Sequence, residues 1–461
     1  MPARQTFRAA ATWAVALAFA LASPSGAQSA DTLRLSLEDA VTRILRSSDE
    51  ARIANAQVAL TDAQVLSARA AGLPQVRLAS SYSQLIQNAR ADIVGQVFGQ
   101  RFTYNTNLQV QQSLFQGGRV LSASQAASRS ERAAIATREE TRASLAVNIQ
   151  RAYLNVVFTA RLLEIQQRNL VLAEERLEQT AQLERAGRAS RYEVLRSRVE
   201  RANLEPVVRQ AESDRELAEL EVRRLLDLPL DRPLALTTTL DATRVRALAD
   251  AAVTATASTG VRASVRAAEA TASARDAAIR VARADLLPSF NFTFTTGFLA
   301  LPRMNGFPTV FEQQNGWYPD QSVQFFFNWP LFDGLRAKGA IDLAQAQAQL
   351  ASLELRRVKE EASIDVAGAQ AELARARAVA TARETTVREA EEAFELASLR
   401  FTRGIGTQLE VSDAQLALLT ARSTDARATF DLYLAVAELA RVRAEPIPLP
   451  DGGSVTTRIS R

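Results

Sequence analysis

The chain has 461 residues, 47% of them hydrophobic, which is enough for about two to four ordinary domains with a large core. It contains no cysteine and no histidine, which excludes Cys/His zinc sites, thiol nucleophiles, Ser-His-Asp triads and histidine-ligated haem. Paired carboxylates need neither residue, so the composition does not exclude enzyme chemistry, but it favours a protein that is not an enzyme and has no metal or cofactor. The 55 basic and 51 acidic residues alternate in sign along the chain, which is typical of exposed helix faces and not of nucleic-acid binding.

Residues 1–27 have the features of a signal peptide. Arg4 and Arg8 form a basic segment, Ala9–Ala22 is an apolar stretch, and Ser25–Ala27 offers small residues for cleavage. The apolar stretch is too short to cross a membrane as a helix. The sequence thus predicts an exported protein whose mature form begins near Gln28, without a lipid anchor because there is no cysteine to carry one.

Two tandem copies of one unit, residues 28–245 and 246–461, are indicated by three ordered matches. Residues 114–119 recur at 331–336, and residues 185–194 recur at 402–411, both at an offset of 217. Residues 71–74 recur at 285–288 with an offset of 214, and an insertion in a loop explains the difference. Three matches that occur in the same order in both halves of the chain favour a tandem duplication.

Each copy predicts a helix, two strands, a long helix, a tight turn and a returning helix. A period of seven in the apolar residues of both long helices indicates coiled-coil packing. At 1.5 Å per residue each long helix would measure about 105 Å, and an ordinary bundle of shorter helices is the alternative. In the first copy we expect strands at 75–87 and 101–114, the long helix at 118–187 and the returning helix at 190–226, followed by a connector. In the second copy we expect strands at 288–299 and 321–332, the long helix at 335–404 and the returning helix at 407–441, followed by a C-terminal tail. The heptad residues are Ile149, Val156, Leu163, Leu170 and Leu177, then Leu373, Ala380, Val387, Phe394 and Phe401.

The predicted strands alternate between apolar residues and Asn, Gln, Ser or Thr, which indicates half-buried strands. The apolar side could pack on the protein's own helices in a soluble sheet, or it could face lipid in an outer-membrane barrel. The signal peptide and the helix length favour the barrel. Four strands cannot close a barrel, so two or three chains would have to share it. The candidate lipid-facing residues are Phe102, Tyr104, Phe290, Phe292, Phe294, Phe325, Phe327 and Trp329.

The ordered set of motifs resembles the TolC-type outer-membrane efflux protein family. The set begins with Leu33–Val41, continues with a Leu-Pro entry into a strand and the 114–119 segment, and ends with a Gly-x-x-Ser/Thr-x-x-Glu-Val turn after the long helix. The resemblance implies a mostly α-helical homotrimer, with a periplasmic α-barrel of coiled-coil helices and four strands per protomer in a shared 12-stranded transmembrane β-barrel. It implies an outer-membrane location with most of the chain, including the C-terminal tail, in the periplasm.

The same resemblance implies partners and a function. The chain would be the exit duct of a tripartite efflux or type I secretion system, docked with a periplasmic adaptor (membrane fusion protein) and an inner-membrane pump, either ABC or proton-driven. The cargo is left open between drugs, metals and proteins. The alternative is a periplasmic coiled-coil scaffold or adaptor whose strands form a soluble sheet.

Family members narrow their periplasmic mouth with acidic residues just after the second glycine turn, and these positions align with Glu410 and Asp413 here. Their first-copy counterparts are Glu193 and Arg196. Relatives can hold the mouth closed through a tyrosine and an arginine, but Phe401 and Gly406 stand at those positions. We therefore expect either that Arg403 or Arg188 substitutes, or that the resting tip is looser. The expected adaptor contacts are Arg185, Gly187, Arg188, Ser190, Arg403, Gly404 and Thr407.

Overall fold

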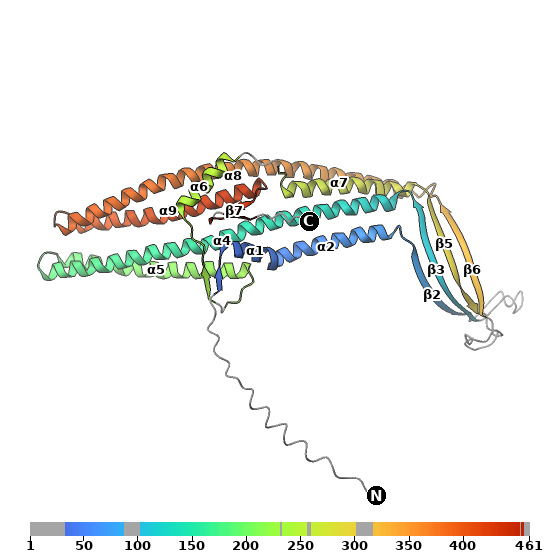
Figure 1. Cartoon of the computed structure of the whole chain (residues 1–461), viewed down its shortest axis with the longest axis horizontal. Coiled ribbons are helices and arrows are strands. Elements are labelled where there is room, and N and C mark those ends of the chain that lie inside the picture. Colours follow the sequence, from blue (N-terminus) through green and yellow to red (C-terminus); the bar gives the residue numbers. More distant parts are fainter. Residues whose placement is uncertain are drawn as a thin grey trace, which may run out of the picture.

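The computed structural model describes residues 33–86, 102–230, 233–255, 260–300, 317–451 and 453–455. The predicted signal peptide lies outside the described residues, as do residues 87 and 101 at the ends of two predicted strands. The molecule is elongated, with a sheet at one end and two helical hairpins that extend to the other (Figure 1). In the described part of the chain, no helix is both long and apolar enough to cross a membrane.

In the first copy, a break at Ser48 divides the expected leading helix into two. The side chain of Ser36 caps the first of these helices and that of Ser48 caps the second, because each accepts a hydrogen bond from a backbone N–H of the first turn. The elements are β1 (Leu33–Leu35), α1 (Leu37–Ser47), α2 (Asp49–Ala70), β2 (Gln75–Gln84), β3 (Phe102–Gln116), α4 (Arg119–Arg185), α5 (Arg191–Leu225) and β4 (Leu234–Leu236).

In the second copy the same order recurs. The elements are α6 (Ala242–Thr254), α7 (Ala263–Arg283), the short helix η1 (Ala284–Leu286), β5 (Ser289–Ala300), β6 (Trp317–Asn328), α8 (Arg336–Thr402), α9 (Gln408–Val442), β7 (Ile447–Pro448) and β8 (Ser454–Val455). The connector and the C-terminal tail contain short strands: β4 pairs in parallel with β1, and β7 pairs with β8.

The duplication extends to the backbone conformation. Helices α8 and α9 begin and end 217 residues after α4 and α5. The described residues with positive φ also fall into pairs at this offset: Gly117 and Gly334, Gly118 and Leu335, Gly187 and Gly404, Asp227 and Ala444. Leu335 and Ala444 therefore keep a left-handed conformation that is unfavourable for a residue with a Cβ atom.

Strand β6 differs from the predicted range 321–332. It begins at Trp317 and ends at Asn328, so Trp329 lies beyond the strand. Pro330 has no backbone N–H to continue the ladder, although the apolar alternation of the sequence runs past it. The indole N–H of Trp329 instead donates to the carbonyl of Leu286 at 3.2 Å.

The four long strands form one antiparallel sheet in the order β2-β3-β5-β6. Residues that lie opposite one another in the register share a face, so the pairing joins the apolar residues of all four strands into one continuous surface. One row across this face is Val76, Val110, Phe294 and Val323, and another contains Tyr82 and Tyr104. The opposite face carries mainly amides and hydroxyls, with Leu299 and Phe326 among its apolar exceptions.

The main core lies near the middle of the long helices, where α4 and α9 pack together. Tyr153 and Tyr433 are fully buried there, and the rings of Phe158 and Phe430 stack at a centroid distance of 5.4 Å. The Tyr153 hydroxyl donates to the Leu35 carbonyl at 2.8 Å and accepts from the Thr238 N–H at 3.0 Å, which fastens the strands β1 and β4 to α4. This core joins the two copies within one chain.

Candidate functional site: the helical tips and the contact between the two copies

Each long helix ends in the same glycine-based turn. Gly187 and Gly404 have φ values of 70° and 76°, which favour glycine. The N–H of Arg188 donates to the Leu183 carbonyl at 2.8 Å, and the equivalent Ile405 N–H donates to Arg400 at 3.0 Å, as in a Schellman motif. Both hairpins therefore turn within a few residues, at the end of the molecule furthest from the sheet (Figure 1).

The helices that follow the two turns are capped differently. Ser190 and Glu193 form a reciprocal capping box, in which the Glu193 carboxylate accepts the Ser190 N–H at 2.7 Å. Thr407 accepts the Glu410 N–H at 3.3 Å, but the Glu410 carboxylate lies 3.6 Å from the guanidinium of Arg400. The two equivalent acids thus differ: the Glu193 carboxylate caps the start of its own helix, whereas the Glu410 carboxylate is partly neutralised by Arg400, which was not predicted from the sequence.

Arg196 and Asp413, which are equivalent by duplication, line the same groove. It lies between α5 and α9 and has a volume of about 400 Å³. Asp413 is exposed, and within the described part of the chain neither Asp413 nor Arg196 makes a side-chain hydrogen bond or an ion pair. Among the described residues, the groove thus presents one unpaired cation and one unpaired carboxylate near the tips of the hairpins.

Beneath this groove, polar residues replace the apolar core in the contact between the copies. The buried guanidinium of Arg176 on α4 donates to the side chains of Ser412 and Gln415 on α9, at 3.2 Å to Ser412. It also lies 3.6 Å from the Glu200 carboxylate on α5, and Ser412 donates to that carboxylate at 3.2 Å. Burial lowers the pKa of Arg176, and the Glu200 charge opposes this effect.

Two further contacts extend this network. The Gln415 amide donates to the side-chain oxygen of Asn169, and the Gln408 amide donates to the Ser197 hydroxyl. We call the whole set the polar seam: Asn169, Arg176, Ser197, Glu200, Gln408, Ser412 and Gln415. All are buried except Glu200 and Ser412, which are partly buried.

The heptad prediction holds best near the core. Ile149, Val156 and Leu163 are buried, whereas Leu170 and Leu177 are only half-buried because Asn169 and Arg176 occupy the contact beside them. In the second copy Leu373 and Ala380 are buried, and the last three heptad residues, Phe401 included, are half-buried. The contact between the copies is therefore apolar in the middle and polar towards the tips.

The two arginines expected to replace the family's closing contact are not engaged. Within the described residues, Arg188 and Arg403 are exposed and form no ion pair or side-chain hydrogen bond. Arg185 is also exposed and unpaired in this part of the chain. Towards the tips, the polar seam links the two hairpins, and its residues were not predicted from the sequence. A closing role for Arg188 or Arg403 stays a prediction.

The predicted lipid-facing residues gather on the apolar face of the sheet, except Trp329. Phe325 and Phe327 are exposed, and Phe290, Phe292 and Phe294 are half-buried. Phe290 stacks on Phe325 at 5.9 Å, and at the far end of the strands Tyr82 packs on Tyr104 at 5.0 Å. Phe102, beside Tyr82, is buried.

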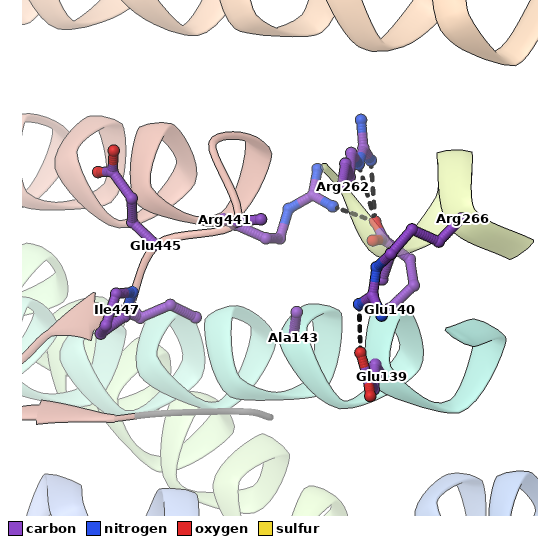
Figure 2. Close-up of a pocket in the computed structure, with 11 residues that line it drawn as sticks. Glu139, Glu140, Ala143, Arg262, Arg266, Arg441, Glu445 and Ile447 are labelled. Carbon is purple, nitrogen blue, oxygen red and sulfur yellow. Dashed lines mark hydrogen bonds and ion pairs between the residues drawn. The ribbon is translucent and has the colours of Figure 1, made fainter. Parts of the chain in front are cut away.

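A separate hollow of about 170 Å³ lies at mid-length, between α4, the start of α7 and the end of α9. One carboxylate oxygen of Glu140 accepts from Arg262 at 2.9 and 3.1 Å and from Arg441 at 2.9 Å, and Arg266 pairs with Glu139 (Figure 2). Because these charges neutralise one another, the hollow is best described as an ionic junction of three helices.

The family model for outer membrane efflux proteins matches residues 40–227 and 256–444, which is most of the chain and both copies. The chain therefore belongs to the outer membrane efflux protein family, and the resemblance inferred from the motifs is confirmed. No curated protein sequence matches the chain.

Several solved structures share the fold. VceC of Vibrio cholerae is 20% identical with a TM-score of 0.72, and the match covers 88% of this chain and 95% of that one. The CmeC outer membrane channel of Campylobacter jejuni is 15% identical with a TM-score of 0.76, covering 88% and 85%. The open state of the MtrE outer membrane channel of Neisseria gonorrhoeae is 22% identical with a TM-score of 0.70, covering 89% of each chain.

Proposed function

We propose that this protein is the outer-membrane exit duct of a tripartite efflux or type I secretion system. The observation that carries the proposal is the placement of a four-stranded sheet with one apolar face at one end, and two paired-helix tips at the other. Helices α4 and α8 each have 67 residues, a length of about 100 Å, which is enough to extend well beyond a membrane.

Three copies would complete the membrane-spanning part. The sheet has two unpaired edges, β2 and β6, and open edges are not tolerated in lipid. Three sheets joined edge to edge give a closed barrel of twelve strands, with the aromatic face against lipid and the amide face towards water. The strands have 10 to 15 residues, which suits a tilted crossing of the bilayer.

The tips would form the periplasmic mouth and the docking surface. Asp413 and Glu410 from three copies would give two carboxylate rings that favour cations, and Arg196 and Glu193 lie on the neighbouring helix. The exposed tip residues Arg185, Arg188 and Arg403, beside the turns formed by Gly187, Ser190, Gly404 and Thr407, would contact the adaptor. A pump in the inner membrane would supply the energy, and the duct itself would be passive.

The polar seam would hold the resting mouth closed. Its contacts join α4 and α5 of the first copy to α9 of the second. They would replace the closing link that relatives make with a tyrosine and an arginine, because Phe401 and Gly406 lack the groups to form it. Hydrogen bonds of this kind can be exchanged for water when the hairpins separate, whereas an apolar contact would have to expose its surface.

Cell fractionation tests the proposal. We expect the protein in the outer-membrane fraction, extractable only with detergent, and as a trimer after purification. Release by osmotic shock as a monomer would instead support a periplasmic scaffold.

A further inference from the structure

Near the tips, helix α9 of the second hairpin lies against both helices of the first hairpin. The side chain of Ser412 on α9 bonds to Arg176 on α4 and to Glu200 on α5, at 3.2 Å in each case. The second hairpin has an equivalent surface, since α8 and α9 have the same lengths as α4 and α5 and follow them at a constant offset of 217 residues. There the counterparts of Arg176 and Glu200 are Ala393 and Ala417, and both are exposed. In the part of the chain that the structure describes, this surface of α8 and α9 is thus uncovered.

The face of α9 that makes the contact also has an uncovered counterpart, on α5. Ser412 and Gln415 of α9 correspond to Leu195 and Arg198 of α5. Gln415 is buried and Ser412 is partly buried, whereas the Leu195 side chain is 47% exposed and Arg198 is exposed. A single chain therefore carries both halves of a second contact of the same kind, and the two halves belong to different hairpins and are not joined.

We propose that α5 of one molecule docks on α8 and α9 of a second copy of this chain. Leu195 then lies between Ala393 and Ala417 of the second molecule, and Arg198 lies beside its Glu389. This inference rests on the proposed trimeric duct and specifies how the molecules meet near its mouth. Because the contact joins two different surfaces, it can repeat from molecule to molecule and close into a ring.

The apolar part of this contact replaces a polar part of the seam. Within one chain, the Ser412 hydroxyl lies between a guanidinium and a carboxylate, and it bonds to both. At the equivalent positions between molecules, Leu195 meets two alanines, so neither a donor nor an acceptor is left without a partner. The small alanine side chains leave room for the leucine, whose exposed apolar surface would be removed from water.

The charged part of the contact is indicated by a hollow between α4 and α9. Leu172 on α4 and Gln415 on α9 both line this hollow, so they lie close together. Their counterparts at the offset of 217 are Glu389 and Arg198. Both counterparts are exposed, and within the described residues neither forms an ion pair or a side-chain hydrogen bond. The docking therefore brings together two opposite charges that are unpaired in the described part of one chain, which favours this pair of surfaces over a contact between two identical ones.

The test is a charge exchange between Arg198 and Glu389, read out by the temperature at which the detergent-solubilised trimer dissociates. R198E and E389R each place like charges in the contact, so each should dissociate at a lower temperature than the wild type. The R198E/E389R double variant should recover most of the loss, and the recovery should shrink at high salt. The matched control is E395R on α8, which should have little effect. Its counterpart Glu178 is exposed and, among the described residues, bonds only to Gln182 on its own helix.

A double variant whose loss equals the sum of the two single losses would overturn the pairing. If the single variants fail to assemble, L195C/A417C tests the apolar part of the same contact, because the chain has no cysteine of its own. A short bismaleimide linker should join these cysteines between molecules and give covalent dimers and trimers on a denaturing gel. Monomers alone on that gel would overturn the docking of α5 on α9. A wild-type protein that is monomeric in detergent would refute the duct itself, which distinguishes the two failures.

Discussion

Arg176 of the first copy donates a hydrogen bond to Gln415 of the second, and both side chains are buried in the contact between the copies. The same guanidinium reaches Ser412 and lies near Glu200, so one arginine joins three helices. Both partners are buried, whereas the arginines at the very tips are exposed. Replacement of Arg176 should therefore affect the resting mouth more than replacement of any tip arginine.

We predict that Arg176→Leu weakens the closed mouth. The substitution leaves the Gln415 side-chain oxygen without its donor, at a cost of about 1–3 kcal/mol for an unsatisfied buried group, and removes the positive charge beside Glu200. Channels of the variant in planar bilayers should show a larger mean conductance than the wild type. The control is Arg168→Leu, since Arg168 is exposed and, among the described residues, pairs only with Glu164 on its own helix. Equal effects of the two substitutions would contradict the role of the seam.

The caps at the two tips should differ in strength. Ser190→Ala removes one half of a reciprocal capping box and should cost about 1–2 kcal/mol, and Thr407→Ala removes a single bond and should cost about 0.5–1 kcal/mol. Hydrogen exchange of the first-turn amides of α5 and α9 measures both effects. Similar loss of protection at both tips would show that the Glu193 half of the box contributes nothing.

A glycine should stabilise the start of α8. Leu335 has a φ of 72°, where its first-copy counterpart is Gly118, and a left-handed conformation costs a residue with a side chain about 1–2 kcal/mol. Glycine also adds conformational entropy to the unfolded chain, which offsets part of this gain. Leu335→Gly should therefore raise the free energy of unfolding, measured by thermal unfolding, by about 0.5–1 kcal/mol. Leu335→Ala keeps the strain and is the control; a gain from alanine alone would point to the lost leucine side chain.

Asp425 gives the stability a dependence on pH. Burial raises the pKa of Asp425 above its ordinary value of 3.8, the Glu384 charge adds to the rise, and Arg246 opposes it. Because the pKa of this carboxyl is higher in the folded state, the folded state binds more protons than the unfolded state does in this pH range. The free energy of unfolding therefore falls as the pH rises from 3.8 through the raised value. Asp425→Asn should remove this decrease and raise the melting temperature at neutral pH, measured by calorimetry against pH.

The matched control for Asp425 is Asp431→Asn. Asp431 lies on the same helix and pairs with Arg427 at 3.0 Å. Its replacement should lower the melting temperature slightly or leave it unchanged at neutral pH. An equal increase from both substitutions would show that net charge, and not the burial of Asp425, is responsible.

The general fold follows from patterns that depend on spacing alone. The offset of 217 residues, the period of seven and the alternation in the strands are visible without coordinates, and glycine at positions 187 and 404 marks the turns. The end of β6 was misplaced, because Trp329 continues the alternation and only Pro330 signals the end of the ladder.

The polar seam was harder to predict. Asn169, Arg176 and Gln415 resemble the many surface residues of helices rich in Arg, Gln and Glu, and burial depends on how the second copy packs against the first. One signal was available: Asn169 and Arg176 are seven residues apart, as are Gln408 and Gln415, so both pairs keep the period of the coiled coil. Polar residues on that period mark a contact that is specific without being apolar.

The central claim is that the protein is an export duct with a guarded mouth, and single-channel recording from trimers inserted in planar bilayers tests it most directly. We expect discrete, cation-selective channels of small conductance, and we expect the Glu410→Gln/Asp413→Asn double variant to lose most of the selectivity, measured as a reversal potential in a salt gradient. Glu175→Gln, on the exposed face of α4, should leave it unchanged. Trimers that insert but pass no current would contradict the account, and so would an unchanged cation selectivity in the Glu410→Gln/Asp413→Asn double variant.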